Sequence, residues 1–78
     1  MDKLIEITKR AVEDYGFRQI AQWSPEDLVV QWQLSSREAE VLKGPIKDEL
    51  GQLPVPVEPR DYSAVEGRLA DIIKKALS

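Results

Sequence analysis

The stretch that decides the fold covers residues 24–42 and reads SPEDLVVQWQLSSREAEVL. It begins like a helix, continues like a strand and ends like a helix again. Ser24 and Pro25 suit a helix start, because serine caps helices and proline fits the first helical position. The same two residues also suit the first half of a type I turn. The runs on either side must therefore decide between a helix and a turn.

Those two runs favour the turn. Residues 17–23 read FRQIAQW and residues 28–34 read LVVQWQL, and both contain the β-branched and aromatic types that are enriched in strands. Pairing them about Pro25 and Glu26 gathers the apolar side chains on one face, and a slip of one residue would scramble that segregation. We therefore predict an antiparallel β-hairpin. Its apolar face would carry Phe17, Gln19, Ala21, Trp23, Leu28, Val30, Trp32 and Leu34, and its outward face Arg18, Ile20, Gln22, Val29, Gln31 and Gln33.

Helices are expected before and after the hairpin. Apolar residues at three- and four-residue spacing indicate amphipathic helices near both ends of the chain. Ser35 and Glu38 have the spacing of a capping box, and Pro45 should kink the helix that they open. The predicted fold class is α+β, a single small domain in which an antiparallel β-hairpin packs against helices. Its order is α-β-β-α-α: a helix over 3–15, the hairpin over 17–34, a kinked helix over 36–50, an extended Pro-rich connector over 53–59 and a helix over 63–77.

The composition excludes several kinds of chemistry. The 78 residues include no cysteine and no histidine, so disulfides, the usual zinc ligands and the common nucleophile–base pairs are absent. The serines fall mostly at expected caps and turns, and the glycines are scattered singly instead of forming a phosphate-binding loop. We therefore predict no catalytic residues, no cofactor and no metal, and hence a protein that is not an enzyme. The remaining alternative is a carboxylate-based enzyme, which would require a carboxyl of raised pKa in a cleft.

Charge and hydropathy bear on partners and location. The formal net charge is −3, which disfavours nucleic-acid binding without excluding it, because such binding usually rests on a basic face. No apolar run approaches the roughly 18 residues that span a bilayer. The start, MDKLIEITKR, lacks the apolar segment of a signal peptide. We expect a cytoplasmic protein with no membrane partner and no small-molecule ligand.

Small size is the main indication of function. A single core in so short a chain supplies only about 3–5 kcal/mol, and small domains often add a disulfide, a metal or a partner. With the first two absent, we predict a non-enzymatic interaction or accessory module that self-associates or docks on a larger protein. The candidate contact surface is the outward hairpin face, with an ordinary solvated face as the alternative. The candidate partner-binding residues are Ile20, Gln22, Val29, Gln31 and Gln33.

One local likeness supports a different function. Residues 34–42 read LSSREAEVL, which resembles the first-helix opening of LuxR-type helix-turn-helix regulators, often L-T-x-R-E-x-E-V-L. The resemblance covers nine of the 78 residues, and the continuation Lys43-Gly44-Pro45 departs from the family pattern. A capping box followed by an amphipathic helix produces the same letters. The alternative that the resemblance implies is helix-turn-helix-like DNA binding, in which residues 24–34 would be helical.

Overall fold

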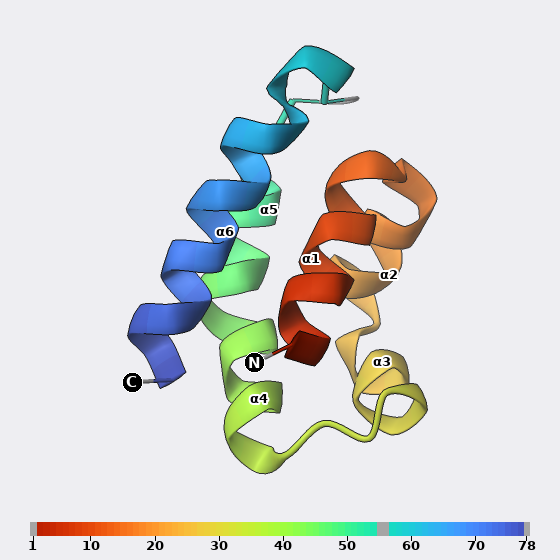
Figure 1. The fold of residues 1–78 in the computed structure, drawn as a ribbon. Helices are drawn as coiled ribbons and strands as arrows, with labels where there is room; N and C mark the ends of the chain where they lie inside the picture. The colour runs from red at the N-terminus through yellow and green to blue at the C-terminus, as the bar shows by residue number, and fades with distance from the viewer. Residues whose placement is uncertain (1, 55–56, 78) are drawn as a thin grey trace.

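A computed structural model gives the fold of this chain and describes residues 2–54 and 57–77. Within that part, every regular element is helical (Figure 1). The elements are α1 (Asp2–Glu13), α2 (Tyr15–Trp23), α3 (Pro25–Gln31), α4 (Ser36–Val41), the π-helical segment η1 (Leu42–Ile46), α5 (Lys47–Gly51), the 3-10 turn η2 (Pro59–Asp61) and α6 (Tyr62–Leu77).

The predicted α+β class is wrong, and so is the hairpin over residues 17–34. None of the described residues forms a strand, and the expected hairpin is the helix pair α2 and α3. A hairpin would have placed Leu28 and Val30 on one face, whereas the structure leaves Leu28 1% exposed and Val30 76% exposed. The buried positions instead follow alternating steps of three and four residues, which a helix brings to one side. These positions are Arg18, Ala21, Pro25 and Leu28.

The break between α2 and α3 comes from Pro25. Proline disfavours the α conformation in the residue before it, and Ser24 accordingly has φ −137° and ψ 52°. The Ser24 backbone N–H still donates to the Ile20 carbonyl at 2.8 Å and so ends α2. Pro25 then takes the first position of α3, where its missing N–H costs nothing. Of the two interpretations of Ser24 and Pro25, the helix start is correct.

The capping box that opens α4 is confirmed. The Glu38 backbone N–H donates to Ser35 Oγ at 3.2 Å, and the Ser35 N–H donates to Glu38 Oε1 at 2.8 Å. Pro45 lies inside η1, so the chain accommodates the proline by a π-helical segment between α4 and α5. The chain thus stays helical through the position where a kink was expected, and the π-helical segment replaces the α-helical pattern around Pro45.

The expected extended connector, residues 53–59, falls partly on residues 55 and 56, which lie outside the described residues. Of the others, Pro59 begins η2, and the remaining four are not helical. Val57 is buried in the core, so this part of the connector contributes to packing.

The helices form a bundle of four antiparallel segments. In Figure 1, α1 runs up, α2 and α3 return, α4 to α5 run up again, and α6 runs down. α1 packs against both α2 and α6, while α5 contacts α2 and α4 contacts α6. The four segments therefore surround one core. The core consists of Leu4, Ile7, Ala11, Val12, Ala21, Leu28, Val41, Leu42, Ile46, Leu50, Val57, Leu69 and Ile73.

Candidate functional site

The exposed large hydrophobic side chains of the described residues all belong to α2 and α3. Trp23 is 73% exposed and Val30 76%, while Tyr15 and Ile20 are each just over 40% exposed. Scattered exposed apolar residues are ordinary on protein surfaces, but a tryptophan left mostly in water is less so. The concentration on two consecutive short helices marks this region as the candidate site.

The outer side of α2 carries no charge. Successive residues lie about 100° apart around the axis of a helix. Ala21 is buried, so the opposite side of α2 faces solvent. That side presents four exposed residues, hereafter the α2 face: Gly16, Gln19, Ile20 and Trp23. An uncharged outer side is unusual here, because 32% of all residues in the chain are charged.

The single charged residue of α2 points inward. Arg18 is 2% exposed, and its Nη1 donates to the Pro54 carbonyl at 3.0 Å. Its guanidinium also lies over the Tyr15 ring, 4.7 Å from the centroid. The Arg18 side chain therefore ties α2 to the connector after α5 and leaves the helix exterior without a cation.

Charged side chains of both signs flank the two ends of the α2 face, since Glu26 lies near Lys47 at one end and Arg10 lies over the Phe17 ring near the other. At the C-terminal end, Lys47 Nζ lies 5.6 Å from the centroid of the Trp23 ring. At the N-terminal end, Asp14 caps α2, because its Oδ1 accepts from the Phe17 N–H at 3.2 Å. The same Oδ1 lies 3.3 Å from the place that a Cβ on Gly16 would occupy. The α2 face thus runs from an anion beside a glycine to a cation beside a tryptophan.

The structure does not bring the predicted contact residues to one face. In a helix, residues two apart lie about 200° apart, so Ile20 diverges from Gln22 and Val29 from Gln31. The five residues lie as follows: Ile20 exposed on α2, Gln22 half-buried near Gly51, Val29 half-buried against the core, Gln31 exposed on α3, and Gln33 exposed after α3 with φ 53°.

Of those five, Ile20 alone belongs to the exposed apolar surface of α2 and α3. Trp23 and Val30 were missed because the hairpin assigned both to its core face. The signal that could have found them is the spacing of Arg18, Ala21, Pro25 and Leu28, since it fixes which side of each helix faces outward.

A carboxyl pair joins α1 to α6. Glu66 on α6 lies beside Glu13, the last residue of α1, and its Oε2 is buried with no hydrogen-bond partner among the described residues. Burial raises the pKa of Glu66 to about 7; the Glu13 carboxyl adds to the rise, and Lys9 opposes it. Within residues 2–54 and 57–77 there is no pocket and no group of three or more side chains that could hold a metal. The pair can therefore hold a proton near neutral pH, and no substrate-binding cavity adjoins it in this part of the chain.

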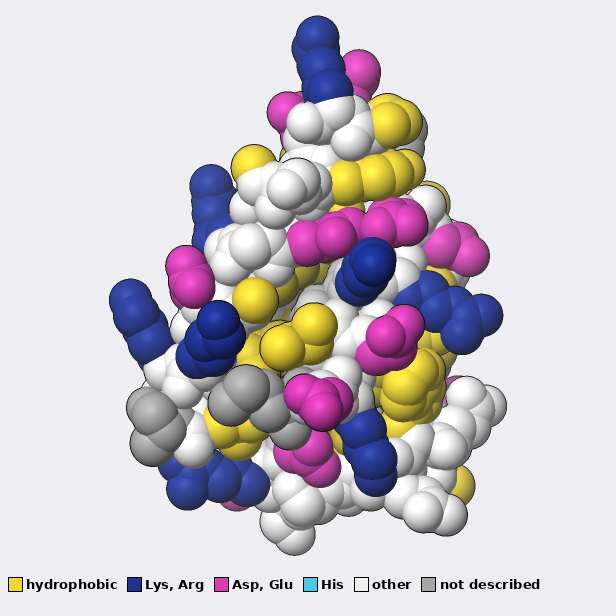
Figure 2. Space-filling model, in the orientation of Figure 1, with side chains coloured by type: hydrophobic (Ala, Val, Ile, Leu, Met, Phe, Trp, Pro, Cys, Tyr) yellow, Lys and Arg dark blue, Asp and Glu magenta, His cyan; other side chains and the backbone are white. Residues whose placement is uncertain are grey.

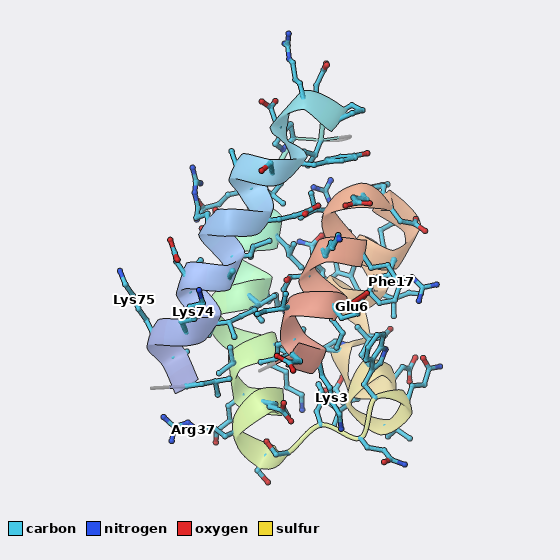
Figure 3. The ribbon with its side chains drawn as sticks, viewed as in Figure 1. Lys3, Glu6, Phe17, Arg37, Lys74 and Lys75 are labelled. Carbon is cyan, nitrogen blue, oxygen red and sulfur yellow. The ribbon has the colours of Figure 1, made fainter. Side chains whose placement is uncertain are left out.

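Several basic side chains lie toward one end of the bundle, and some of them are hydrogen-bonded within the fold. Figure 3 places Lys3, Arg37, Lys74 and Lys75 toward the end of the bundle where α1 begins and α6 ends. Lys3 Nζ donates to the Gln33 carbonyl at 3.2 Å, and an Arg37 nitrogen donates to the Ala76 carbonyl at 3.2 Å. Acidic and basic side chains are mixed across the face shown in Figure 2. This face therefore lacks the continuous basic surface that is typical of nucleic-acid binding.

No family model, no curated protein and no solved structure matches this chain. None of the helices in the described part has the length and apolar character needed to cross a bilayer.

Proposed function

We propose that this chain is a small, non-enzymatic protein-interaction module of the cytoplasm, and that α2 and α3 carry its contact surface. The observation that carries the proposal is the exposure of Trp23, at 73% of its surface. Tryptophan can bury roughly 150–250 Å² and is enriched among the residues that dominate binding energy. In the free chain most of that apolar area faces water. A complex with a partner that covered it would be stabilised by the hydrophobic free energy of removing this area from water.

The surroundings of Trp23 support the same function. Interface centres are depleted of charged residues and enriched in aromatic ones. The α2 face matches that description, because its four residues are uncharged and Tyr15 lies on the same helix. A bundle with so few core residues also has more to gain from a partner than a larger domain has.

The experiment is an affinity pull-down from lysate with the wild-type chain, Trp23→Ala and Arg60→Ala. Arg60 is the matched control, because its large side chain is 81% exposed and lies on η2, away from α2 and α3. We expect a stoichiometric protein partner, or self-association, that Trp23→Ala abolishes and Arg60→Ala retains. Equal behaviour of the two variants, or the absence of any protein contact of the wild type, would overturn the proposal.

A second candidate is a helix-turn-helix-like DNA-binding regulator, which two observations favour. Residues 25–31, which are part of the range 24–34 that this alternative requires, are helical, and α4 begins at the capping box of the LuxR-like stretch. Against it, α4 continues through η1 and α5, and α6 runs antiparallel beside α4, without the short turn and steep crossing of that motif. The net charge of −3 also opposes DNA binding.

Fluorescence anisotropy with labelled duplex DNA at two salt concentrations separates the two candidates. We expect no binding near physiological salt. Binding that falls steeply between about 50 and 200 mM salt would favour the DNA-binding regulator.

A further inference from the structure

We propose that the α2 face docks on the α2 face of a second copy of this chain, giving a two-fold dimer in which the α2 helices lie antiparallel. This inference rests on the proposed function, because it names the partner of the same surface. Its occupant is fixed by two properties of the face: the spacing of its residues and the charges at its ends.

The spacing makes the face complementary to itself. Gly16 and Trp23 lie equally far along the chain from the midpoint between Gln19 and Ile20. A two-fold axis through that midpoint places Trp23 of each copy opposite Gly16 of the other, and Gln19 opposite Ile20. Because Gly16 has no side chain and is exposed, the indole ring can approach its backbone beside Asp14 Oδ1, which lies 3.3 Å from where a Cβ would stand. The largest residue of the face therefore meets the smallest one, twice.

The charges complement each other in the same register. Lys47 Nζ lies 5.6 Å from the Trp23 ring centroid, and Asp14 Oδ1 lies 3.3 Å from where a Cβ on Gly16 would stand. The other charges near these ends have partners within the chain: Glu26 pairs with Lys43 at 3.3 Å, and Arg10 lies over the Phe17 ring. Placing Trp23 opposite the partner's Gly16 therefore brings Lys47 toward the partner's Asp14. The two-fold axis repeats this opposite-charge contact on the other side of the interface. The antiparallel arrangement also aligns the two helix dipoles favourably.

The size of the contact sets its strength. Nine residues of α helix extend only about 13 Å, and the whole chain exposes 4790 Å². A standard stable interface buries about 800 Å² per partner, or roughly one-sixth of that surface. The α2 face alone covers less than this, so the dimer is weak, with a dissociation constant on the order of 10 μM or above.

The first test is sedimentation equilibrium of the full chain from about 1 μM to about 1 mM. We expect a reversible dimer, about 30-fold weakening by Trp23→Ala, since buried tryptophans dominate interfaces, and no change in Arg60→Ala. Thermal unfolding at low concentration should be similar for all three, because both side chains lie mostly in solvent. A wild-type chain that stays monomeric, or a dimer that tolerates Trp23→Ala, would overturn the inference.

The second test reads the register directly by cross-linking. The chain contains no cysteine, so Gln19→Cys introduces a single thiol next to the proposed two-fold axis. Mild oxidation should link Gln19→Cys chains into dimers. The matched control is Ala64→Cys, at an exposed position on α6, which should stay monomeric. Equal linking of both variants, or of neither, would contradict the antiparallel register.

The outcomes separate this inference from the function on which it rests. If the wild type is monomeric but Trp23→Ala loses a lysate partner, the proposed function stands and the two-fold dimer does not. If the wild type is monomeric and Trp23→Ala retains every lysate partner, both the proposed function and the two-fold dimer are wrong. A dimer disrupted by Trp23→Ala together with selective linking of Gln19→Cys supports both.

Discussion

Two helices pack against α1, and they differ on the side that faces water. α6 buries Leu69 and Ile73 and exposes charged residues, among them Asp71 and Lys74. α2 buries Ala21 and even its one charged residue, Arg18, and exposes an uncharged side with a tryptophan. The inner sides serve one core. The outer sides differ, since that of α6 carries charges while that of α2 is the contact surface that we propose.

The largest predicted change in stability concerns Leu28 and Val30 of α3, which the predicted hairpin placed on the same apolar face. Leu28→Ala should lower the free energy of unfolding by about 2–4 kcal/mol, because Leu28 is buried in the core. Val30→Ala should change it by less than about 0.5 kcal/mol, because Val30 is exposed. Urea unfolding at low protein concentration measures both. Similar losses in the two variants would contradict the helical structure of this segment.

The difference between Leu28 and Val30 also shows which parts of the fold the sequence could predict and which it could not. The helices at the two ends were predicted to within two residues, over 3–15 and 63–77, because local apolar spacing determines them. Over 17–34 the inward positions include an arginine and a proline. Hydrophobicity patterns do not count these types as core residues, so the helical spacing was hidden and a short alternating run appeared to be a strand.

The candidate site could be predicted only in part, for the same reason. Trp23 and Trp32 are the same residue type in similar sequence surroundings, and the predicted hairpin assigned both to its core face. Trp32 packs against the core four residues after Leu28, whereas Trp23 lies two residues after Ala21 and points away from it. Which tryptophan is exposed depends on the helical phase, and tertiary packing sets that phase. Nor could Glu66 be singled out, because its partner Glu13 comes from a distant part of the chain.

The second prediction concerns the inner contact between α1 and α6. The pKa of Glu66 is raised to about 7 in the folded chain from an ordinary value of 4.5. The folded state therefore holds a proton that the unfolded state has lost between these pH values. The contribution of Glu66 to stability is thus greatest below pH 4.5 and is lost as pH rises through about 7. Because Glu66 is only partly buried, the loss should be about 1–2 kcal/mol after solvent screening.

Glu66→Gln should remove most of that fall, because the amide cannot ionise. Urea unfolding at pH 5, 6, 7 and 8 measures it, with Glu58→Gln as a control for the loss of one carboxylate at an exposed position. A wild-type chain whose stability is unchanged between pH 5 and 8 would show that the Glu66 carboxyl is not perturbed.

The third prediction compares the two serines that precede α3 and α4. Ser35→Ala should cost about 1 kcal/mol, because it removes the side-chain half of the capping box. Ser24→Ala should cost less than about 0.5 kcal/mol, because the Ser24 side chain makes no capping hydrogen bond. The variants would be compared by thermal unfolding. If Ser24→Ala were the costlier change, the start of α3 would have to be stabilised differently from what the structure shows.

The smallest effect contrasts the glycines of α2 and α6. Gly67 lies exposed within α6, and a Cβ added there would meet nothing within 4 Å. Gly67→Ala should therefore raise the free energy of unfolding by about 0.5–1 kcal/mol, because alanine restricts the unfolded chain and favours the helix. Since α6 lies outside the proposed dimer contact, sedimentation should give the same association constant as the wild type. A loss of stability would mean that α6 makes a close contact at Gly67 in solution, and a loss of association would move the docking surface from α2 to α6.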